Sequence, residues 1–265
     1  MADLLLKVTN LSIAFGGLRA VSGFSCELVP GELTGLIGPN GAGKTTVFNM
    51  LSGVYTPTSG EINYWDRKDK VYNVKAMRPA ALNHIGIART FQNIRLFGNM
   101  TVEDNVRIAL HSQRTETPLD VLFRLKRFRL DEERMIEKTG ELLSLFKIEN
   151  KKHELARNLP YGEQRKLEIA RALAANPALL LLDEPAAGMN PQETEELMGL
   201  IGFIRRKFRL TILLIEHDMR LVMGICERLM VLDYGKTIAS GTPEAIQKNP
   251  AVIKAYLGED FLKKG

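Results

Sequence analysis

Residues 38–45 have the types and the spacing that hold a phosphate chain. They read G-P-N-G-A-G-K-T and match the pattern G-x-x-x-x-G-K-[ST] at every specified position. Glycines let the backbone wrap around an oxyanion so that successive N–H groups point at it, and Lys44 adds a full positive charge. The hydroxyl of Thr45 is a suitable ligand for Mg²⁺. We therefore expect this phosphate loop to bind a nucleoside triphosphate, rather than to be a chance glycine-rich turn.

The segments around the phosphate loop supply the context that the motif requires. Leu33–Ile37 is an apolar run that predicts a strand, and Lys44–Leu51 predicts a helix. The unpaired N–H groups and positive dipole end of such a helix favour phosphate. The candidate nucleotide ligands are therefore Gly38, Pro39, Asn40, Gly41, Ala42, Gly43, Lys44, Thr45 and Thr46.

Two carboxylates follow a second apolar run. Leu179–Leu182 predicts a buried strand, and Asp183 and Glu184 come directly after it. Ligands of open α/β sheets bind at the carboxyl ends of the strands, so we expect this pair at the edge that carries the phosphate loop. Asp183 would hold Mg²⁺, and Glu184 would orient or deprotonate the attacking water. Without the phosphate loop, this pair could equally be part of a solvated Asp-Glu-Pro turn with no catalytic role.

Two other side chains are candidates for a functional role only because of where they lie along the chain. His217 follows a third predicted strand, Leu210–Ile215, which favours a role in sensing the γ-phosphate. A lone histidine is more often a surface or packing residue. Gln92 lies just before a helical region and carries no signal by itself.

The composition is that of an ordinary globular chain. Its 265 residues are 45% hydrophobic, and 36 basic against 31 acidic residues give a net charge of +5. This mild excess fits an acidic partner or membrane surface, but the balance is too even to indicate nucleic-acid binding. No apolar run approaches the ~18 residues that span a bilayer, and we expect no secretory signal. Cys26 and Cys226 suit a reducing cytosol as small buried hydrophobes.

The order of predicted elements indicates an α/β core interrupted by a helical insert. Before about Gly98 the chain has short strand-like runs; from there to about Asn150 it is helical and highly charged, with Thr101 as the first cap. After Gly162, strands and helices alternate again. We expect residues 1–98 and 165–242 to form the ATP-binding core, 99–164 a helical subdomain, and 243–265 a helical tail. The predicted early strands are Leu4–Val8, Phe24–Val29 and Glu61–Trp65.

Taken in order, these motifs resemble those of the ATP-binding cassette (ABC) ATPases over almost the whole chain. The resemblance implies a P-loop NTPase core with an antiparallel β subdomain and an inserted all-helical subdomain. It gives Gln92 a place at the entry to the helical subdomain and among the metal ligands, and makes His217 a switch residue. Phe15 occupies the place of the aromatic residue that stacks on adenine.

The resemblance also identifies Leu159–Glu163 as a signature loop. Family members pair head to tail, so Tyr161, Gly162 and Glu163 would contact the ATP of the partner. Pro160 replaces the serine of the family pattern L-S-G-G-Q, Tyr161 its first glycine and Glu163 its glutamine. These departures alter the contacts offered to the partner's site. None of them falls on a residue that is expected to bind or hydrolyse the ATP held by this chain's own phosphate loop.

Several longer segments resemble one group of ABC ATPases, the larger ATPase subunit of bacterial branched-chain amino acid importers. They are Arg89–Gln92, Leu159–Arg165, Pro185–Pro191, Ile215–Met219 and Asn249–Gly258. This resemblance implies ATP hydrolysis coupled to import. It also implies a second ATPase subunit (identical or paralogous), two transmembrane permease subunits and a periplasmic binding protein, with this chain at the cytoplasmic face of the inner membrane.

Other functions remain open from the sequence. The stretch Tyr256–Phe261 is also similar to the ATPase of the lipopolysaccharide exporter, and related importers carry urea or amides. A soluble ABC ATPase of DNA repair or translation would need a long coiled coil or two cassettes, and an unrelated P-loop kinase would leave the signature loop unexplained. The basic stretch Phe123–Arg129 suits acidic lipid or nucleic acid, or simply a solvated face.

Overall fold

The computed structural model describes residues 4–111 and 126–257. The basic stretch Phe123–Arg129 and the end Gly258–Phe261 lie outside the residues whose side chains it describes. The strands are β1 (Leu6–Phe15), β2 (Leu18–Leu28), β3 (Leu33–Ile37), β4 (Ser59–Trp65), β5 (Val71–Asn73), β6 (Ile87–Arg89), β7 (Leu179–Asp183), β8 (Thr211–Ile215), β9 (Arg228–Asp233) and β10 (Lys236–Gly241). The α-helices are α1 (Lys44–Leu51), α2 (Pro79–Ile85), α3 (Val102–His111), α5 (Lys126–Leu145), α6 (Tyr161–Ala174), α7 (Pro191–Phe208), α8 (Met219–Ile225), α9 (Pro243–Gln247) and α10 (Pro250–Leu257).

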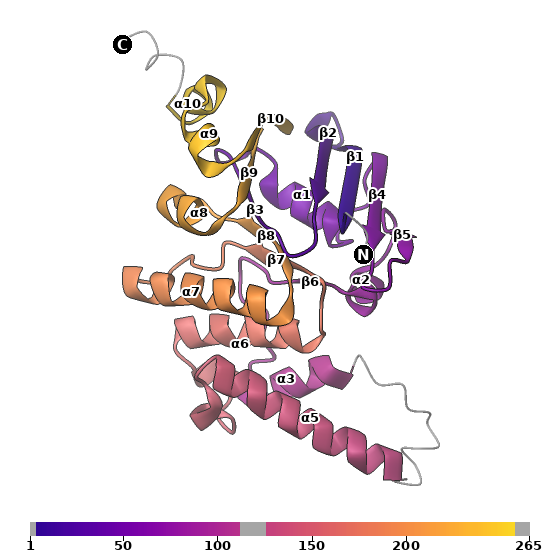
Figure 1. Cartoon of the computed structure of the whole chain (residues 1–265), viewed down its shortest axis with the longest axis vertical. Coiled ribbons are helices and arrows are strands. Elements are labelled where there is room, and N and C mark those ends of the chain that lie inside the picture. Colours follow the sequence, from indigo (N-terminus) through magenta and orange to yellow (C-terminus); the bar gives the residue numbers. More distant parts are fainter. Residues whose placement is uncertain (1–3, 112–125, 258–265) are drawn as a thin grey trace.

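A six-stranded sheet in the order β10-β9-β3-β8-β7-β6 forms the centre of the molecule (Figure 1). β9, β3, β8, β7 and β6 are parallel, and only β10 runs antiparallel to its neighbour. The carboxyl ends of β3, β6, β7 and β8 therefore meet at one edge. The phosphate loop, Glu184 and His217 follow β3, β7 and β8, as the sequence predicts, and Asp183 is the last residue of β7. Gln92 follows β6, a strand that the sequence analysis did not predict.

The central strands are apolar on both faces because each face carries its own core. Leu180, Leu182 and Leu214 belong to the core that contains residues of α6 and α7, whereas Leu179 and Leu181 belong to the core that contains residues of α1 and the second sheet. Such alternation follows from the period of two of a strand. The sheet edge is thereby held rigidly between two layers.

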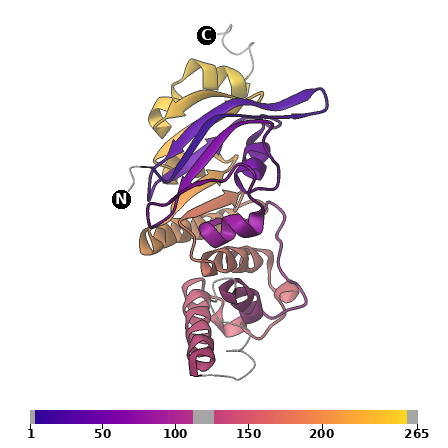
Figure 2. The same cartoon turned by 90° about the vertical axis from the view of Figure 1, so that its right-hand side faces the viewer.

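The second sheet is antiparallel, in the order β2-β1-β4-β5, and packs beside α1 (Figures 1 and 2). Its first strands are longer than the sequence predicts, since β1 runs to Phe15 and β2 begins at Leu18. Asn10 has a positive φ of 51° where the β1–β2 register shifts, so the apolar residues change from Leu6 and Val8 to Leu11 and Ile13. This bulge breaks the strict alternation that would have revealed one long strand.

A helical layer lies below the six-stranded sheet, where α6 separates α3 and α5 from the rest (Figures 1 and 2). α3 begins after Thr101, whose Oγ1 accepts the Asp104 N–H at 3.1 Å, which confirms the predicted cap. The capping box of α7 likewise forms between Asn190 and Glu193. None of the helices in the two described ranges is long and apolar enough to cross a membrane. Cys26 and Cys226 are free and buried, as predicted.

Candidate functional site

The phosphate loop lies between β3 and α1, and two of its glycines have no room for a side chain. Gly38 has a φ of +148°, and a Cβ there would lie 2.0 Å from the Leu232 carbonyl oxygen. Gly43 has a φ of +101°, and its Cβ would lie 2.8 Å from the Ala20 carbonyl oxygen. Both backbone conformation and space require glycine at these positions. The loop is thus set by the neighbouring strands before any ligand arrives.

Lys44 is folded back over the loop and is 8% exposed. Its Nζ donates to the Gly38 carbonyl at 2.7 Å and to the Pro39 carbonyl at 3.0 Å, its only acceptors in the described part of the chain. An ammonium has three donors, so the third is left for a ligand. Burial lowers the pKa of Lys44, and the charges of Glu184 and Asp183 oppose that shift. A buried cation with a donor to spare is well suited to phosphate.

Three predicted catalytic residues meet at the ends of β6, β7 and β8. The Gln92 Nε2 donates to the Glu184 Oε2 at 2.9 Å, and the His217 Nδ1 lies 3.9 Å from the same oxygen. Glu184 has a positive φ of 45°, and its N–H donates to the Ile215 carbonyl at 2.9 Å. A glutamate in this strained region points to a functional constraint on its direction. The structure therefore brings Gln92, Glu184 and His217 together.

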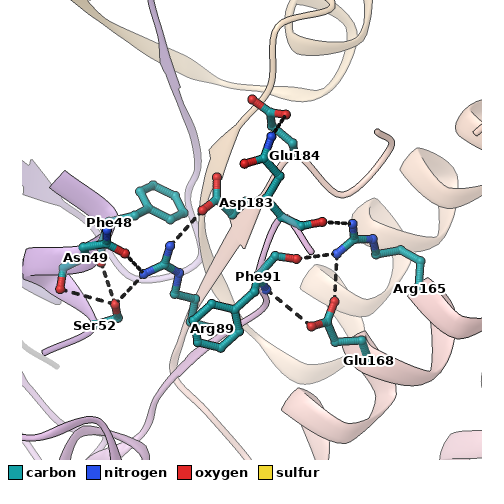
Figure 3. Close-up of polar contacts among 10 residues, drawn as sticks. Phe48, Asn49, Ser52, Arg89, Phe91, Arg165, Glu168, Asp183 and Glu184 are labelled. Carbon is teal, nitrogen blue, oxygen red and sulfur yellow. Dashed lines mark hydrogen bonds and ion pairs between the residues drawn. The ribbon is translucent and has the colours of Figure 1, made fainter. Parts of the chain in front are cut away.

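Asp183 is paired with an arginine that the sequence reasoning did not identify as a site residue. The Arg89 Nη2 donates to the Asp183 Oδ2 at 2.8 Å, and the side chains are 6% and 2% exposed (Figure 3). The Arg89 Nη1 donates at 2.7 Å both to the Asn49 Oδ1 of α1 and to the Ser52 Oγ directly after that helix. Burial raises the pKa of Asp183, and Arg89 opposes that shift. Arg89 therefore joins the phosphate-loop helix to the end of β7.

Glu216 is a second buried residue missed in the sequence. Its Oε1 accepts the Ala186 N–H at 2.9 Å, its Oε2 accepts the His217 N–H at 3.3 Å, and it is 1% exposed. Burial raises its pKa, whereas the two backbone N–H groups lower it. Glu216 links the loop after Glu184 to the loop of His217. An acidic residue between an apolar strand and a histidine was the available signal.

The predicted metal ligands offer only oxygen to a cation, which fits Mg²⁺. They are the hydroxyl of Thr45, the carboxylate of Asp183 and the amide oxygen of Gln92, whose nitrogen is directed at Glu184. No cluster of three or more His, Cys, Asp or Glu side chains suited to a metal occurs among the described residues. Mg²⁺ characteristically combines one or two protein oxygens with substrate phosphates, so this sparse set suits a metal that arrives with a nucleotide.

Phe15, the predicted adenine contact, is half exposed at the end of β1. Its ring meets the ring of Tyr55, which follows α1, edge to face with centroids 5.2 Å apart. Tyr55 was not predicted, and its only signal was an aromatic residue soon after the phosphate-loop helix. A third aromatic residue, Tyr256 of α10, lies against the loop: burial raises the pKa of its hydroxyl, and the Gly38 backbone opposes that shift.

The predicted signature-loop residues lie at the start of α6. In the described part of the chain none of Tyr161, Gly162 and Glu163 hydrogen-bonds to the phosphate loop. Glu163 instead accepts from the Lys151 Nζ at 2.7 and 2.8 Å, and the Tyr161 hydroxyl accepts from Arg165 at 3.3 Å. Within the described part of the chain, the hydrogen bonds of Tyr161 and Glu163 therefore go to other residues of the helical layer.

Comparisons with known proteins agree with this arrangement. Residues 21–187 match a family model described as ABC transporter, and residues 236–262 match one described as branched-chain amino acid ATP-binding cassette transporter. The chain is 46% identical to the high-affinity branched-chain amino acid transport ATP-binding protein LivG of Escherichia coli, over 98% of this chain and all of the relative. It is 43% identical to the corresponding BraF of Pseudomonas aeruginosa, again over 98% of this chain and all of the relative.

Solved structures share the fold. An ATP-binding cassette of an ABC transporter in its ADP conformation superimposes with a TM-score of 0.81 and 31% identity, covering 97% of this chain and all of the other. This agreement confirms the predicted fold class, an α/β nucleotide-binding core with an antiparallel subdomain and a helical subdomain.

Proposed function

This chain belongs to the ABC transporter family of ATP-hydrolysing subunits, and from that premise we propose that it powers import of branched-chain amino acids. One observation carries the proposal: the chain is 46% identical to LivG from end to end. The separate match of residues 236–262 to a branched-chain amino acid cassette model supports the same cargo. No residue of an ATPase subunit needs to touch the transported molecule, so the cargo rests on this similarity.

We propose that the phosphate loop binds ATP through its backbone N–H groups, the side chain of Lys44 and the hydroxyl of Thr45. The spare N–H of Lys44 supports this role, because it is the donor that two backbone carbonyls leave free. The adenine would rest against Phe15, with Tyr55 fixing the position of that ring. The contact with adenine would then come from the end of β1, and the contacts with the phosphates from the phosphate loop and the start of α1.

Hydrolysis would depend on the carboxylates after β7. Mg²⁺, when bound, supplies charge neutralisation on the phosphates. Asp183 and Thr45 would hold it, together with Gln92. Glu184 would orient the attacking water or accept its proton, and the strained backbone of Glu184 directs the carboxylate toward Gln92 and His217. His217 would contact the γ-phosphate.

A second cassette would complete each site. The signature loop at the start of α6 would close on the nucleotide of the partner, through Tyr161, Gly162 and Glu163. Pro160 has neither a hydroxyl nor an N–H to donate there, so the contact must come from the neighbouring residues. The exposed ring of Tyr161 supports such a role. The partner is an identical chain or a paralogue.

The helical subdomain would be the docking surface for two transmembrane permease subunits at the cytoplasmic face of the membrane. Position supports this, since Gln92 joins the nucleotide core to a subdomain that holds none of the hydrolytic residues. A periplasmic binding protein would act indirectly. Lipopolysaccharide export is the second candidate, supported by 35% identity to the export ATPase LptB of Escherichia coli over 97% of this chain. The higher identity to LivG favours import.

The direct test is a deletion of the gene followed by uptake of labelled leucine at low external concentration. We expect uptake of leucine, isoleucine and valine to fall and to return with the wild-type gene. The same gene carrying Glu184→Gln is the matched control and should not restore uptake. Unchanged uptake of all three, with loss of another solute, would refute the cargo and leave the ATPase activity untouched.

A further inference from the structure

Arg165 of α6 is completely buried, at 0% exposure, and its guanidinium faces the backbone of Phe91 (Figure 3). Its Nη1 donates to the Phe91 carbonyl at 2.7 Å and to the Glu168 Oε2 at 2.8 Å. Its Nη2 donates to the Gln92 carbonyl at 2.7 Å. A guanidinium is a rigid planar fork with two separate nitrogens, so it fixes the two carbonyls and the Glu168 carboxylate in one geometry, whereas an ammonium is a single point charge on a flexible stem.

Glu168, one turn further along α6, holds the same segment by its N–H groups. Its Oε1 accepts from the Phe91 N–H at 3.4 Å and from the Arg95 N–H at 3.2 Å, and it is 1% exposed. A buried ion pair by itself adds little to stability, since apolar residues of the same volume usually serve as well. Here the pair satisfies four backbone groups of residues 91–95 instead. The buried pair is therefore explained by the backbone segment 91–95 that it fixes, rather than by a contribution of the ion pair itself to stability.

The guanidinium also reaches the signature loop. The Arg165 Nη2 that bonds to Gln92 lies 3.3 Å from the Tyr161 hydroxyl, at the first residue of α6. The Tyr161 ring packs against the loop after Glu184, because a Cβ on Gly188 would lie 3.3 Å from its Cε1. One side chain thus contacts both the segment of Gln92 and the residue that replaces the first glycine of the signature pattern.

We propose that Arg165, together with Glu168, is a positioning residue that makes the Gln92 segment and the start of α6 move as one body. The inference rests on the proposed function, because nucleotide binding is what displaces Gln92. When the Gln92 side chain leaves Glu184 for the nucleotide, the clamp carries Tyr161–Glu163 with it. Binding of a nucleotide to this chain thereby changes the position of the signature loop, which serves the nucleotide site of the partner cassette.

Hydrogen exchange of Arg165→Lys tests the clamp, because lysine keeps the charge beside Glu168 and loses the fork. Without nucleotide, we expect the amides of Phe91 and Arg95 to exchange about fivefold faster, the equivalent of ~1 kcal/mol for a hydrogen bond. The matched control is Arg228→Lys, since Arg228 also pairs with a glutamate, Glu32, and donates to a backbone carbonyl. That control should leave residues 91–95 unchanged.

The decisive measurement adds a non-hydrolysable ATP analogue with Mg²⁺, at a protein concentration where light scattering shows monomers. In the wild type we expect exchange to change in three segments: 38–45, 91–95 and 160–163. In Arg165→Lys the first two should respond and the third should not. A full response of 160–163 in this variant overturns the clamp. No response of 38–45 in the wild type would instead refute nucleotide binding and with it the proposed function.

Tyr161→Phe tests the same link if Arg165→Lys does not fold, because it removes only the hydroxyl that accepts from the Arg165 Nη2 at 3.3 Å. We expect a weakened response of 160–163 to the analogue, and an unchanged response overturns the link through Tyr161. Tyr72→Phe is its control, since it removes a phenol hydrogen bond of 3.2 Å, to Asp66, far from the site.

Discussion

Replacing Arg89 by methionine removes a guanidinium and keeps an unbranched chain of similar reach. Asp183 then loses its ion-pair partner while it remains 2% exposed. Asn49 of α1, and Ser52 directly after that helix, lose the donor that each accepts from at 2.7 Å. The change therefore leaves a carboxylate without a counter-charge and separates α1 from the end of β7.

The size of the effect follows from the burial. Removing one partner of a buried ion pair costs about 3–5 kcal/mol, because the remaining charge stays desolvated. For a chain of this size each kcal/mol lowers the melting temperature by about 2–4 °C, so we expect a fall of about 6–20 °C. The surface pair Lys7–Glu27 is equally short at 2.7 Å, but its side chains are 45% and 50% exposed. Lys7→Met should cost no more than ~1 kcal/mol.

Thermal unfolding without nucleotide compares Arg89→Met with Lys7→Met. Adding Asp183→Asn to Arg89→Met should restore part of the lost stability, since it removes the stranded charge. Equal melting temperatures for Arg89→Met and Lys7→Met would refute the reasoning. A double variant no more stable than Arg89→Met would show that the loss comes from packing rather than from charge.

The other predictions concern turnover, coupling and acid stability. Glu184→Gln should bind Mg-ATP yet hydrolyse it about 10²–10⁴-fold more slowly, whereas Lys44→Ala should lose affinity; wild-type turnover of the former would exclude Glu184 as the base. Gln92→Ala should impair transport in the assembled complex more than ATP binding, and crosslinks to the permease that map only to residues 242–265 would contradict a docking role for the helical subdomain. Burial raises the pKa of Glu32, but the hydrogen bonds and charge of Arg228 outweigh it and lower the pKa below its ordinary 4.5. The stability from this carboxyl should therefore be complete above about pH 4.5 and be lost as the pH falls further, and Glu32→Gln should flatten that part of an unfolding–pH profile; an unchanged profile would show that the pair contributes nothing.

The hydrolytic site was largely readable from the sequence because its parts follow strands. Strand ends at one sheet edge are close together whatever the rest of the chain does, so Glu184 and His217 needed only a correct strand prediction. Gln92 follows β6, which was not predicted, and was found only through the family resemblance. The phosphate loop was readable for a second reason: its pattern is confined to residues 38–45, and Gly38 and Gly43 have φ values of +148° and +101° that favour glycine. A motif of this kind is local, because it needs only the strand before it and the helix after it.

Several elements were misjudged or missed where local signals were weak. β5 and β6 have three residues each, too few to show a period, and their conformation depends on the neighbouring strands β4 and β7. The long reach of β1 was hidden by the bulge at Asn10. In each case pairing partners distant in sequence, rather than local propensity, determined the structure.

The sequence by itself determined the nucleotide chemistry, the order of the motifs and the family. Only the tertiary structure showed what Arg89, Arg165 and Glu216 do, because no pattern distinguishes a buried charge from a solvated one until its partners are known. The partners of Arg165 lie 73 and 74 residues away, at Gln92 and Phe91, and Asp183 lies 94 residues from Arg89. A charge can be buried only when the fold brings such partners to it, so these contacts are a property of the fold and not of any local segment.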